Sequence, residues 1–314
     1  MRVNQNANII KRLNNKIETQ LYYTFYFIYS NKLTNMNTEN QEMIIVTSIY
    51  FLIGLIIAIM FNLLKPTPIK RWQMDGIPVI PTYPHLHDSM DALVLAPKMK
   101  KWIEKIDNMQ VDIRSIWVSD INWFSKTPDP KKLGFVKFSV NASDKSTGKP
   151  IASNIVFLRG DSVAIFIVVK VMSPISRRSK QYVLLCEQMR VASGQRRKEI
   201  CAGMMDDEGN IASVVLKEVK EETGFNIKHK DELIELGSIY PSPGACDEEI
   251  FLYAWTTTIT EEEFEEKQRR LFGNAAEVEE INLSFVPIKE MNNVLGEMKD
   301  VKAECAFRRY MNSK

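Results

Sequence analysis

Residues 203–225 read GMMDDEGNIASVVLKEVKEETGF, and this stretch decides the fold. After a polar loop, its apolar residues recur at helical spacing, which predicts a helix over residues 211–223. Glu218, Glu221 and Glu222 stand at positions i, i+3 and i+4, so the helix brings three carboxylates within one turn of each other. Like charges so placed repel unless a cation lies between them. The pattern therefore indicates a site for a hard divalent cation, for which Mg²⁺ is the best fit.

The alternative interpretation is a solvated acidic helix face, and the neighbouring residues argue against it. Gly203 stands 21 residues before Gly224. This spacing resembles the Nudix box, G-x5-E-x7-R-E-U-x-E-E-x-G-U, in which U is a bulky aliphatic residue. The sequence departs from the box at three positions: Gly209, Lys217 and Phe225 replace its early Glu, its Arg and its last aliphatic residue. In the family that Glu and Arg brace the loop and helix, and Glu208 with Lys217 is expected to do so here.

Four further segments extend the resemblance. Residues 199–203 (EICAG) look like the E-L-P-A-G lead-in of the nucleoside-diphosphate-sugar branch, and residues 187–190 (EQMR) look like its E-Q-x-R strand. Residues 241–248 (PSPGACDE) look like its S-P-G-x-x-x-E loop. Residues 134–159 are similar to plant ADP-sugar diphosphatases of the Nudix superfamily. Over about residues 95–312 the chain thus resembles this branch and is identified as a member of it.

The resemblance implies an α/β fold class, a Nudix α/β/α sandwich with a mixed sheet, preceded by a β-rich subdomain. We expect the subdomain, a dimerisation element, at 97–160 and the hydrolase domain at 161–314. Residues 162–171 are apolar on both faces, which predicts a central strand. Lys289–Met311 is predicted as one closing helix.

The resemblance also assigns site residues. Glu218 and Glu222 would bind Mg²⁺, for which Mn²⁺ can substitute, with the backbone carbonyl of Ala202 as a further ligand. Glu221 would contribute to the metal site and to catalysis, directly or through water. Glu248 matches the glutamate that orients or deprotonates the attacking water. Substrate contacts are expected from Arg190, Glu199, Arg159 and Gly203, although each arginine also fits a structural ion pair.

These assignments imply Mg²⁺-dependent hydrolysis of the pyrophosphate bond in nucleoside-diphosphate sugars. An ADP-sugar such as ADP-glucose or ADP-ribose, or a UDP-sugar, would yield a nucleoside monophosphate and a sugar 1-phosphate. The alternatives are a Nudix hydrolase for another nucleoside diphosphate derivative and an inactive module that senses a nucleotide. Relatives in this branch are homodimers in which the N-terminal subdomain completes the neighbouring nucleotide pocket, and the same is expected here.

An uncharged apolar block at residues 43–64 predicts a single transmembrane helix, since its length matches the hydrocarbon core of a bilayer. A leader (1–42) precedes it and a Pro-rich tether (65–96) follows. Bases at Lys65, Lys70 and Arg71 predict a cytosolic catalytic domain by the positive-inside rule. An organellar membrane is an alternative, because the leader also carries bases.

Composition excludes several classes of protein. With 45% hydrophobic and 25% charged residues, the chain is neither disordered nor polytopic. A net charge of +2 gives no reason to expect a nucleic-acid partner. Its 4 cysteines are too scattered for a disulfide scaffold and form no CxxC pair.

Overall fold

The computed structural model describes residues 71–107, 110–152, 154–174, 179–205, 210–273 and 280–314, with six residues between 46 and 54. The chain divides into two compact units, residues 1–70 and 71–314, of which the second is described below. Among the described residues, no helix is long and apolar enough to cross a membrane. Apart from those six residues, the predicted leader and transmembrane segment lie outside the described part of the chain.

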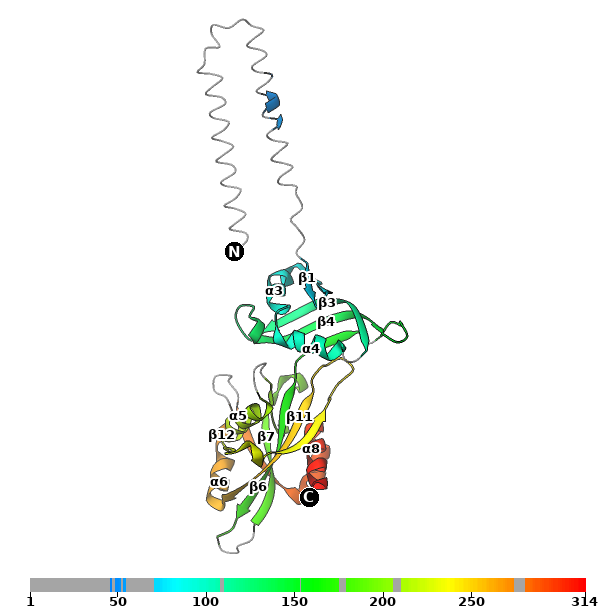
Figure 1. Ribbon diagram of the computed structural model, residues 1–314. Coiled ribbons are helices and arrows are strands. Elements are labelled where there is room, and N and C mark those ends of the chain that lie inside the picture. The colour runs from blue at the N-terminus through cyan, green and yellow to red at the C-terminus, as the bar shows by residue number, and fades with distance from the viewer. Residues whose placement is uncertain are drawn as a thin grey trace, which may run out of the picture. The chain divides into compact units, whose positions relative to one another are not determined.

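The N-terminal subdomain is built on a five-stranded sheet in the order β1-β2-β3-β4-β5 (Figure 1). Its strands are β1 (Trp72–Met74), β2 (Ile77–Pro81), β3 (Val111–Trp123), β4 (Leu133–Asp144) and β5 (Ile155–Leu158). Helix α4 (Pro97–Asp107) packs on this sheet, with the ring of Trp102 edge-on to Phe138 at 4.8 Å between centroids. A buried apolar core joins the helix and the sheet.

Residues 72–96 differ from the predicted Pro-rich tether, because they belong to this subdomain. After β1 and β2 come a 3₁₀ helix, η2 (Pro84–Ser89), and the short helix α3 (Met90–Leu93). Leu86, Met90 and Leu93 are buried in the subdomain core. Several of the prolines mark the ends of elements, where a missing N–H costs little: Pro81 ends β2 and Pro84 begins η2.

The second part of the unit is built on an eight-stranded sheet in the order β10-β11-β6-β7-β13-β12, with β8 paired to β7 and β9 to β6. β6 runs parallel to β11, whereas the other described pairs are antiparallel, so the sheet is mixed as predicted. The strands are β6 (Ser162–Met172), β7 (Ser179–Arg190), β8 (Gln195–Glu199), β9 (Cys201–Met204), β10 (Ile234–Ile239), β11 (Ile250–Thr260), β12 (Leu271–Phe272) and β13 (Ile281–Pro287).

Helices cover both faces of this sheet (Figure 1). They are α5 (Ile211–Thr223), α6 (Glu261–Arg269), α7 (Met291–Met298) and α8 (Val301–Asn312). Alternate residues of β6 point to opposite sides, so Val163 and Ile165 share a core with α5, whereas Ala164 and Phe166 share one with α7 and α8. The α/β/α sandwich and the apolar central strand are therefore as predicted.

The predicted closing helix over Lys289–Met311 is wrong, because the structure breaks it into α7 and α8. Lys299 adopts a left-handed conformation with φ 52°, which ends α7. The side chain of Asp300 then caps α8 by accepting a hydrogen bond from the N–H of Lys302 at 3.1 Å. This break brings Lys302 to the neighbourhood of β8, as described below.

Candidate functional site

Helix α5, which carries the glutamates, is fixed at both ends. At its start, the side chain of Asn210 accepts a hydrogen bond from the N–H of Ala212 at 3.1 Å. At its end, Gly224 adopts φ 65°, a left-handed cap that favours glycine. The ammonium group of Lys267 donates to the last-turn carbonyl of Thr223 at 3.1 Å, which suits the negative end of the helix dipole. The helix is therefore held in a defined position against the sheet.

Glu218 contacts strand β9 directly. Its carboxyl group lies against the Cα of Gly203, in the space that a Cβ at position 203 would occupy. Position 203 therefore requires a glycine because the side chain of Glu218 approaches so closely, and not because the backbone adopts a positive φ. The structure brings together two residues that the sequence predicted for the metal and substrate sites.

Glu222 lies one turn further along α5 and reaches the same strand. Its side chain is only 3% exposed and accepts a hydrogen bond from the N–H of Ala202 at 3.2 Å. Burial raises the pKa of the neighbouring Cys201 thiol well above its ordinary value, and Cys186 and the charge of Glu222 act in the same direction. The buried carboxylate of Glu222 is therefore held in place by the N–H of Ala202 and lies beside a thiol that stays protonated.

Glu221 has a different environment from the other two glutamates. Its side chain is about one-third exposed and forms an ion pair with Lys217, whose Nζ lies 3.9 Å from its carboxylate. The predicted bracing partner of Lys217, Glu208, lies outside the described residues. Glu221 is therefore placed at the side of the helix near solvent, whereas Glu218 and Glu222 contact β9.

The described residues contain no group of three or more His, Cys, Asp or Glu side chains arranged to hold a metal ion. Glu218 and Glu222 nevertheless place two carboxylates against adjacent residues of β9, Gly203 and Ala202. Mg²⁺ is usually bound by one or two carboxylates together with substrate phosphates, and rarely by a cage made only of protein. The donor set therefore fits Mg²⁺ that is bound jointly with a phosphate-bearing ligand.

Glu248, the predicted catalytic carboxylate, lies in the loop just before β11, and its side chain contacts the first residue of β6. Its Oε1 accepts a hydrogen bond from the hydroxyl of Ser162 at 2.8 Å and forms an ion pair with the Nε of Arg159 at 3.1 Å. Ser162 pairs with Met204 in the sheet. Met204 lies two residues from Ala202 in β9, a separation of about 7 Å along the strand. Glu248 is therefore held at the first residue of β6, whose partner strand β9 also contacts the two glutamates of α5.

Arg159 is positioned by an aromatic ring and a loop. Its guanidinium lies 5.8 Å from the ring centroid of Phe135, and its backbone N–H donates to Asp247 at 2.6 Å. The Nε is buried, and its ion pair with Glu248 lacks the alignment of a hydrogen bond. Within the described part of the chain this N–H has no aligned hydrogen-bond acceptor, so the carboxylate of Glu248 is the group that balances its charge.

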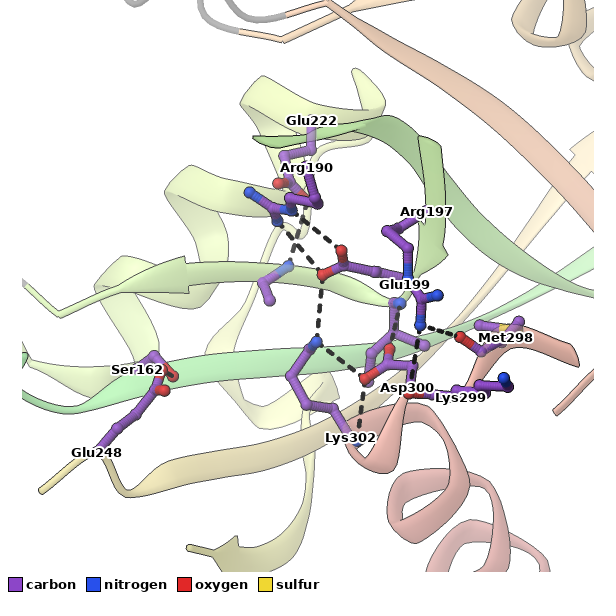
Figure 2. A network of polar contacts seen from close by, with 12 residues as sticks. Ser162, Arg190, Arg197, Glu199, Glu222, Glu248, Met298, Lys299, Asp300 and Lys302 are labelled. Carbon is purple, nitrogen blue, oxygen red and sulfur yellow. Dashed lines mark hydrogen bonds and ion pairs between the residues drawn. The ribbon is translucent and has the colours of Figure 1, made fainter. Parts of the chain in front are cut away.

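Glu199 and Arg190, both predicted to contact substrate, are bound to each other (Figure 2). The Nε and NH2 groups of Arg190 donate to the two carboxylate oxygens of Glu199 at 3.0 and 3.3 Å. Lys302 also donates to Glu199 at 3.2 Å and to Asp300 at 2.9 Å. The structural ion pair considered from the sequence is therefore present for Arg190.

The charged partners of Glu199 and Lys302 shift the pKa of each of these two groups. Burial would raise the pKa of Glu199, but the hydrogen bond from Arg190 and the charge of Lys302 outweigh it and lower that pKa. Burial would likewise lower the pKa of Lys302, yet Asp300 and Glu199 raise it. Glu199 and Lys302 thus remain charged at neutral pH, and the network joins α8 to the strands that precede β9.

A cavity of about 480 Å³ is bounded by helix α4 and by residues that adjoin Ser162 and Glu248 in the sequence. Its lining combines charged side chains with apolar surface. The lining residues are Pro97, Lys98, Lys100, Lys101, Trp102, Glu104, Lys105, Gly160, Asp161, Met205 and Asp247.

Sequence reasoning missed four residues of this region: Ser162, Asp161, Asp247 and Lys302. Asp247 lies within the loop that the sequence motif predicts. Nothing in the sequence indicates that its side chain accepts a hydrogen bond from a backbone N–H. Asp161 and Ser162 directly follow the predicted Arg159 segment. Lys302 gave no signal, because only the break between α7 and α8 brings it to Glu199.

Comparisons with known proteins show where the chain is similar to others. Residues 167–307 match the family profile described as the NUDIX domain. The chain is 30% identical over 189 residues to "Nudix hydrolase 14, chloroplastic" from Arabidopsis thaliana, which is 57% of this chain and 57% of that protein. The chain thus spans little more than half the length of this curated relative. A solved structure titled "Crystal structure of ADP compounds hydrolase" aligns with a TM-score of 0.39 and 11% identity, covering 64% of this chain and 95% of that one.

Proposed function

We propose that this chain, which carries a Nudix domain over residues 167–307, is a Mg²⁺-dependent hydrolase of nucleoside-diphosphate sugars. The pyrophosphate bond would be cleaved to a nucleoside monophosphate and a sugar 1-phosphate. One observation carries the proposal: Glu218 and Glu222 of α5 contact adjacent residues of β9, Gly203 and Ala202. Two carboxylates held at one strand are what a diphosphate substrate and its cation require.

Glu218 and Glu222 would hold the cation together with the backbone carbonyl of Ala202. Bound Mg²⁺ supplies neutralisation of the diphosphate charge and a lower pKa for coordinated water, and Mn²⁺ can supply the same. Arg159 would donate to the phosphate through the terminal amino groups of its guanidinium, since its side chain is 37% exposed while its Nε faces Glu248. The remaining work of catalysis is proton transfer and orientation of the attacking water.

Glu248 is proposed as the general base. Both of its contacts among the described residues involve Oε1, which Ser162 and Arg159 hold, so Oε2 is the oxygen that can accept a proton. Water attacks one phosphorus, its proton moves to Glu248, and the bond to the bridging oxygen breaks, leaving that oxygen on the departing phosphate. A carboxylate is a sufficient base for water of lowered pKa.

The substrate class rests on the sequence motifs. The EICAG, EQMR and PSPGACDE segments resemble the nucleoside-diphosphate-sugar branch, and residues 134–159 resemble its ADP-sugar members. We therefore favour an ADP-sugar, such as ADP-glucose or ADP-ribose, over a UDP-sugar.

The test incubates the full-length chain with Mg²⁺ and ADP-glucose, ADP-ribose, UDP-glucose or a dinucleotide, and measures release of nucleoside monophosphate. Glu222→Gln is the inactive control, because it keeps the side-chain volume and removes the charge. We expect release from at least one sugar nucleotide by the wild type alone. Release from none would overturn the enzyme assignment, and equal release from the variant would overturn the metal assignment.

We further propose that residues 43–64 anchor the chain in a membrane with the catalytic domain on the cytosolic side. The support is the length and lack of charge of this segment, and the bases that follow it. Flotation with lipid vesicles tests the anchor, by comparing the full chain with a chain that begins at residue 71. Protease protection of the C-terminal domain in sealed membranes would reverse the proposed orientation.

A homodimer completes the proposal, with the N-terminal subdomain of each protomer contributing to the site of its partner. Its support is the resemblance to the dimeric branch. Light scattering after chromatography measures the mass of the purified chain, which is 36.2 kDa as a monomer. A monomer that is fully active would contradict this part of the proposal.

A further inference from the structure

The chain passes from the five-stranded to the eight-stranded sheet through residues 157–162, and this connection runs along the loop that follows β10. At one end, the N–H of Phe157 donates to the carbonyl of Ala245 at 2.7 Å. At the other end, the N–H of Ser162 donates to the carbonyl of Glu249 at 3.0 Å. Two segments far apart in the sequence are therefore hydrogen bonded along their length.

Asp161 lies within this connection and holds several parts of the site. Its side chain is 3% exposed and receives Lys101 at 2.6 Å and Lys105 at 3.0 Å, both from α4. The N–H of Glu249 also points to its carboxylate, at 3.4 Å. Its backbone carbonyl accepts the N–H of Met205, at the end of β9, at 3.0 Å. One residue thus touches α4, β9 and the loop that carries the proposed base.

The two lysines determine the charge of this residue. Burial would raise the pKa of Asp161, but the hydrogen bonds and charges of Lys101 and Lys105 outweigh it and lower that pKa. Lys105 also lies 3.7 Å from the carboxylate of Glu249. The loop is therefore bound to an ionised, buried carboxylate whose counter-ions come from the N-terminal subdomain.

We propose that Asp161, clamped by Lys101 and Lys105, is a positioning residue that fixes Glu248 relative to β9. It acts through Ser162 on one side, whose hydroxyl donates to Glu248, and through Glu249 on the other. Helix α4 therefore contributes to catalysis through the position of the base. This inference rests on the proposed function for its kinetic part, and its structural part stands independently.

The first experiment is hydrogen–deuterium exchange of the full-length chain, followed in peptides that cover residues 245–249. The variants are Asp161→Asn and the double variant Lys101→Ala/Lys105→Ala. Both lysines are partly exposed, so the double variant removes charge with little loss of packing. We expect exchange in these peptides to accelerate by about fivefold or more, because the loop loses its anchor.

Two matched controls accompany these variants. Lys101→Arg/Lys105→Arg keeps two cationic donors and is expected to restore slow exchange. Glu304→Gln removes an exposed ion pair with Arg308 on α8 and is expected to leave the loop unchanged. Unchanged exchange in the double alanine variant would overturn the proposal, whether or not the chain hydrolyses any sugar nucleotide.

The second experiment is a double-mutant cycle on kcat, with the sugar nucleotide that the wild type hydrolyses. Asp161→Asn is expected to lower kcat about 10-fold or more while KM changes little, because the base is misplaced. In a Glu248→Gln background the same substitution is expected to cost less than about twofold, since there is no base left to position. Equal losses in both backgrounds would mean that Asp161 acts elsewhere and would overturn the proposal.

Discussion

The carboxyl group of Glu218 lies against the Cα of Gly203, so α5 and β9 approach each other closely at a position that has no side chain. A methyl group at 203 would have to displace Glu218 or move β9 away from α5. Either movement changes the spacing between the two glutamates and Ala202, and spacing is what a shared cation depends on.

We expect Gly203→Ala to lower kcat/KM about 100-fold, because small misplacements of charged groups at a site have effects of this order. The activity lost should be partly recovered at higher Mg²⁺ concentration if the displaced carboxylate binds the cation. Gly296→Ala, in α7, is the matched control, since a Cβ there meets nothing within 4 Å. Normal activity in Gly203→Ala would mean that Glu218 has no fixed role.

The glycine that caps the end of α5 gives a second prediction, which concerns the stability of the fold. Gly224 has φ 65°, and a Cβ at this position would also meet the ring of Phe272. Gly148 has φ 68° but open space around it, so Gly148→Ala isolates the backbone strain, which is about 1–2 kcal/mol. We expect Gly224→Ala to lower the free energy of unfolding by a further ~1 kcal/mol or more, because of the added contact. Urea denaturation measures both, and equal losses would refute the role of Phe272.

Much of this architecture follows from local patterns in the sequence. The helix at residues 211–223 and the central strand near 162–171 were predicted within one residue of their ends. Helical periodicity and the glycine that follows mark the helix, whereas an apolar run marks the strand. The elements within residues 72–96 were not predicted, because proline content alone does not reveal that the prolines lie at the ends of elements. The break at Lys299 also escaped prediction, because a left-handed lysine has no sequence signal.

The site was predictable where it lies on one element and less so where it joins several. Glu218 and Glu222 belong to one helix face, and helical spacing is enough to place them together. The partners of Glu199 come from β7 and α8, and the partners of Asp161 come from α4. Such long-range contacts depend on how the elements pack, which motif spacing does not specify.

The different environments of the three glutamates give a third prediction. Glu222 is buried beside Ala202, whereas Glu221 is partly exposed and paired with Lys217. We expect Glu222→Gln to lower kcat about 100-fold or more, the order seen when one charge-stabilising group is removed. Glu221→Gln should have a much smaller effect. Steady-state kinetics over a range of Mg²⁺ concentrations compares the two, and a larger loss in Glu221→Gln would show that the helix presents its other side to the substrate.

The network around Glu199 gives a fourth prediction, on the pH dependence of stability. The pKa of Glu199 is lowered from its ordinary value of 4.5, because the hydrogen bond from Arg190 and the charge of Lys302 outweigh the effect of burial. A group whose pKa is lowered by folding stabilises the protein above its unfolded pKa, and this contribution is lost as the pH falls through the folded pKa. Glu199→Gln should therefore be less stable than the wild type at neutral pH, and the difference should shrink below about pH 4.5. Urea denaturation at neutral and acid pH measures it, with Glu297→Gln, an exposed side chain on α7, as the control. A difference that stays constant or grows on acidification would contradict the assigned ion pairs.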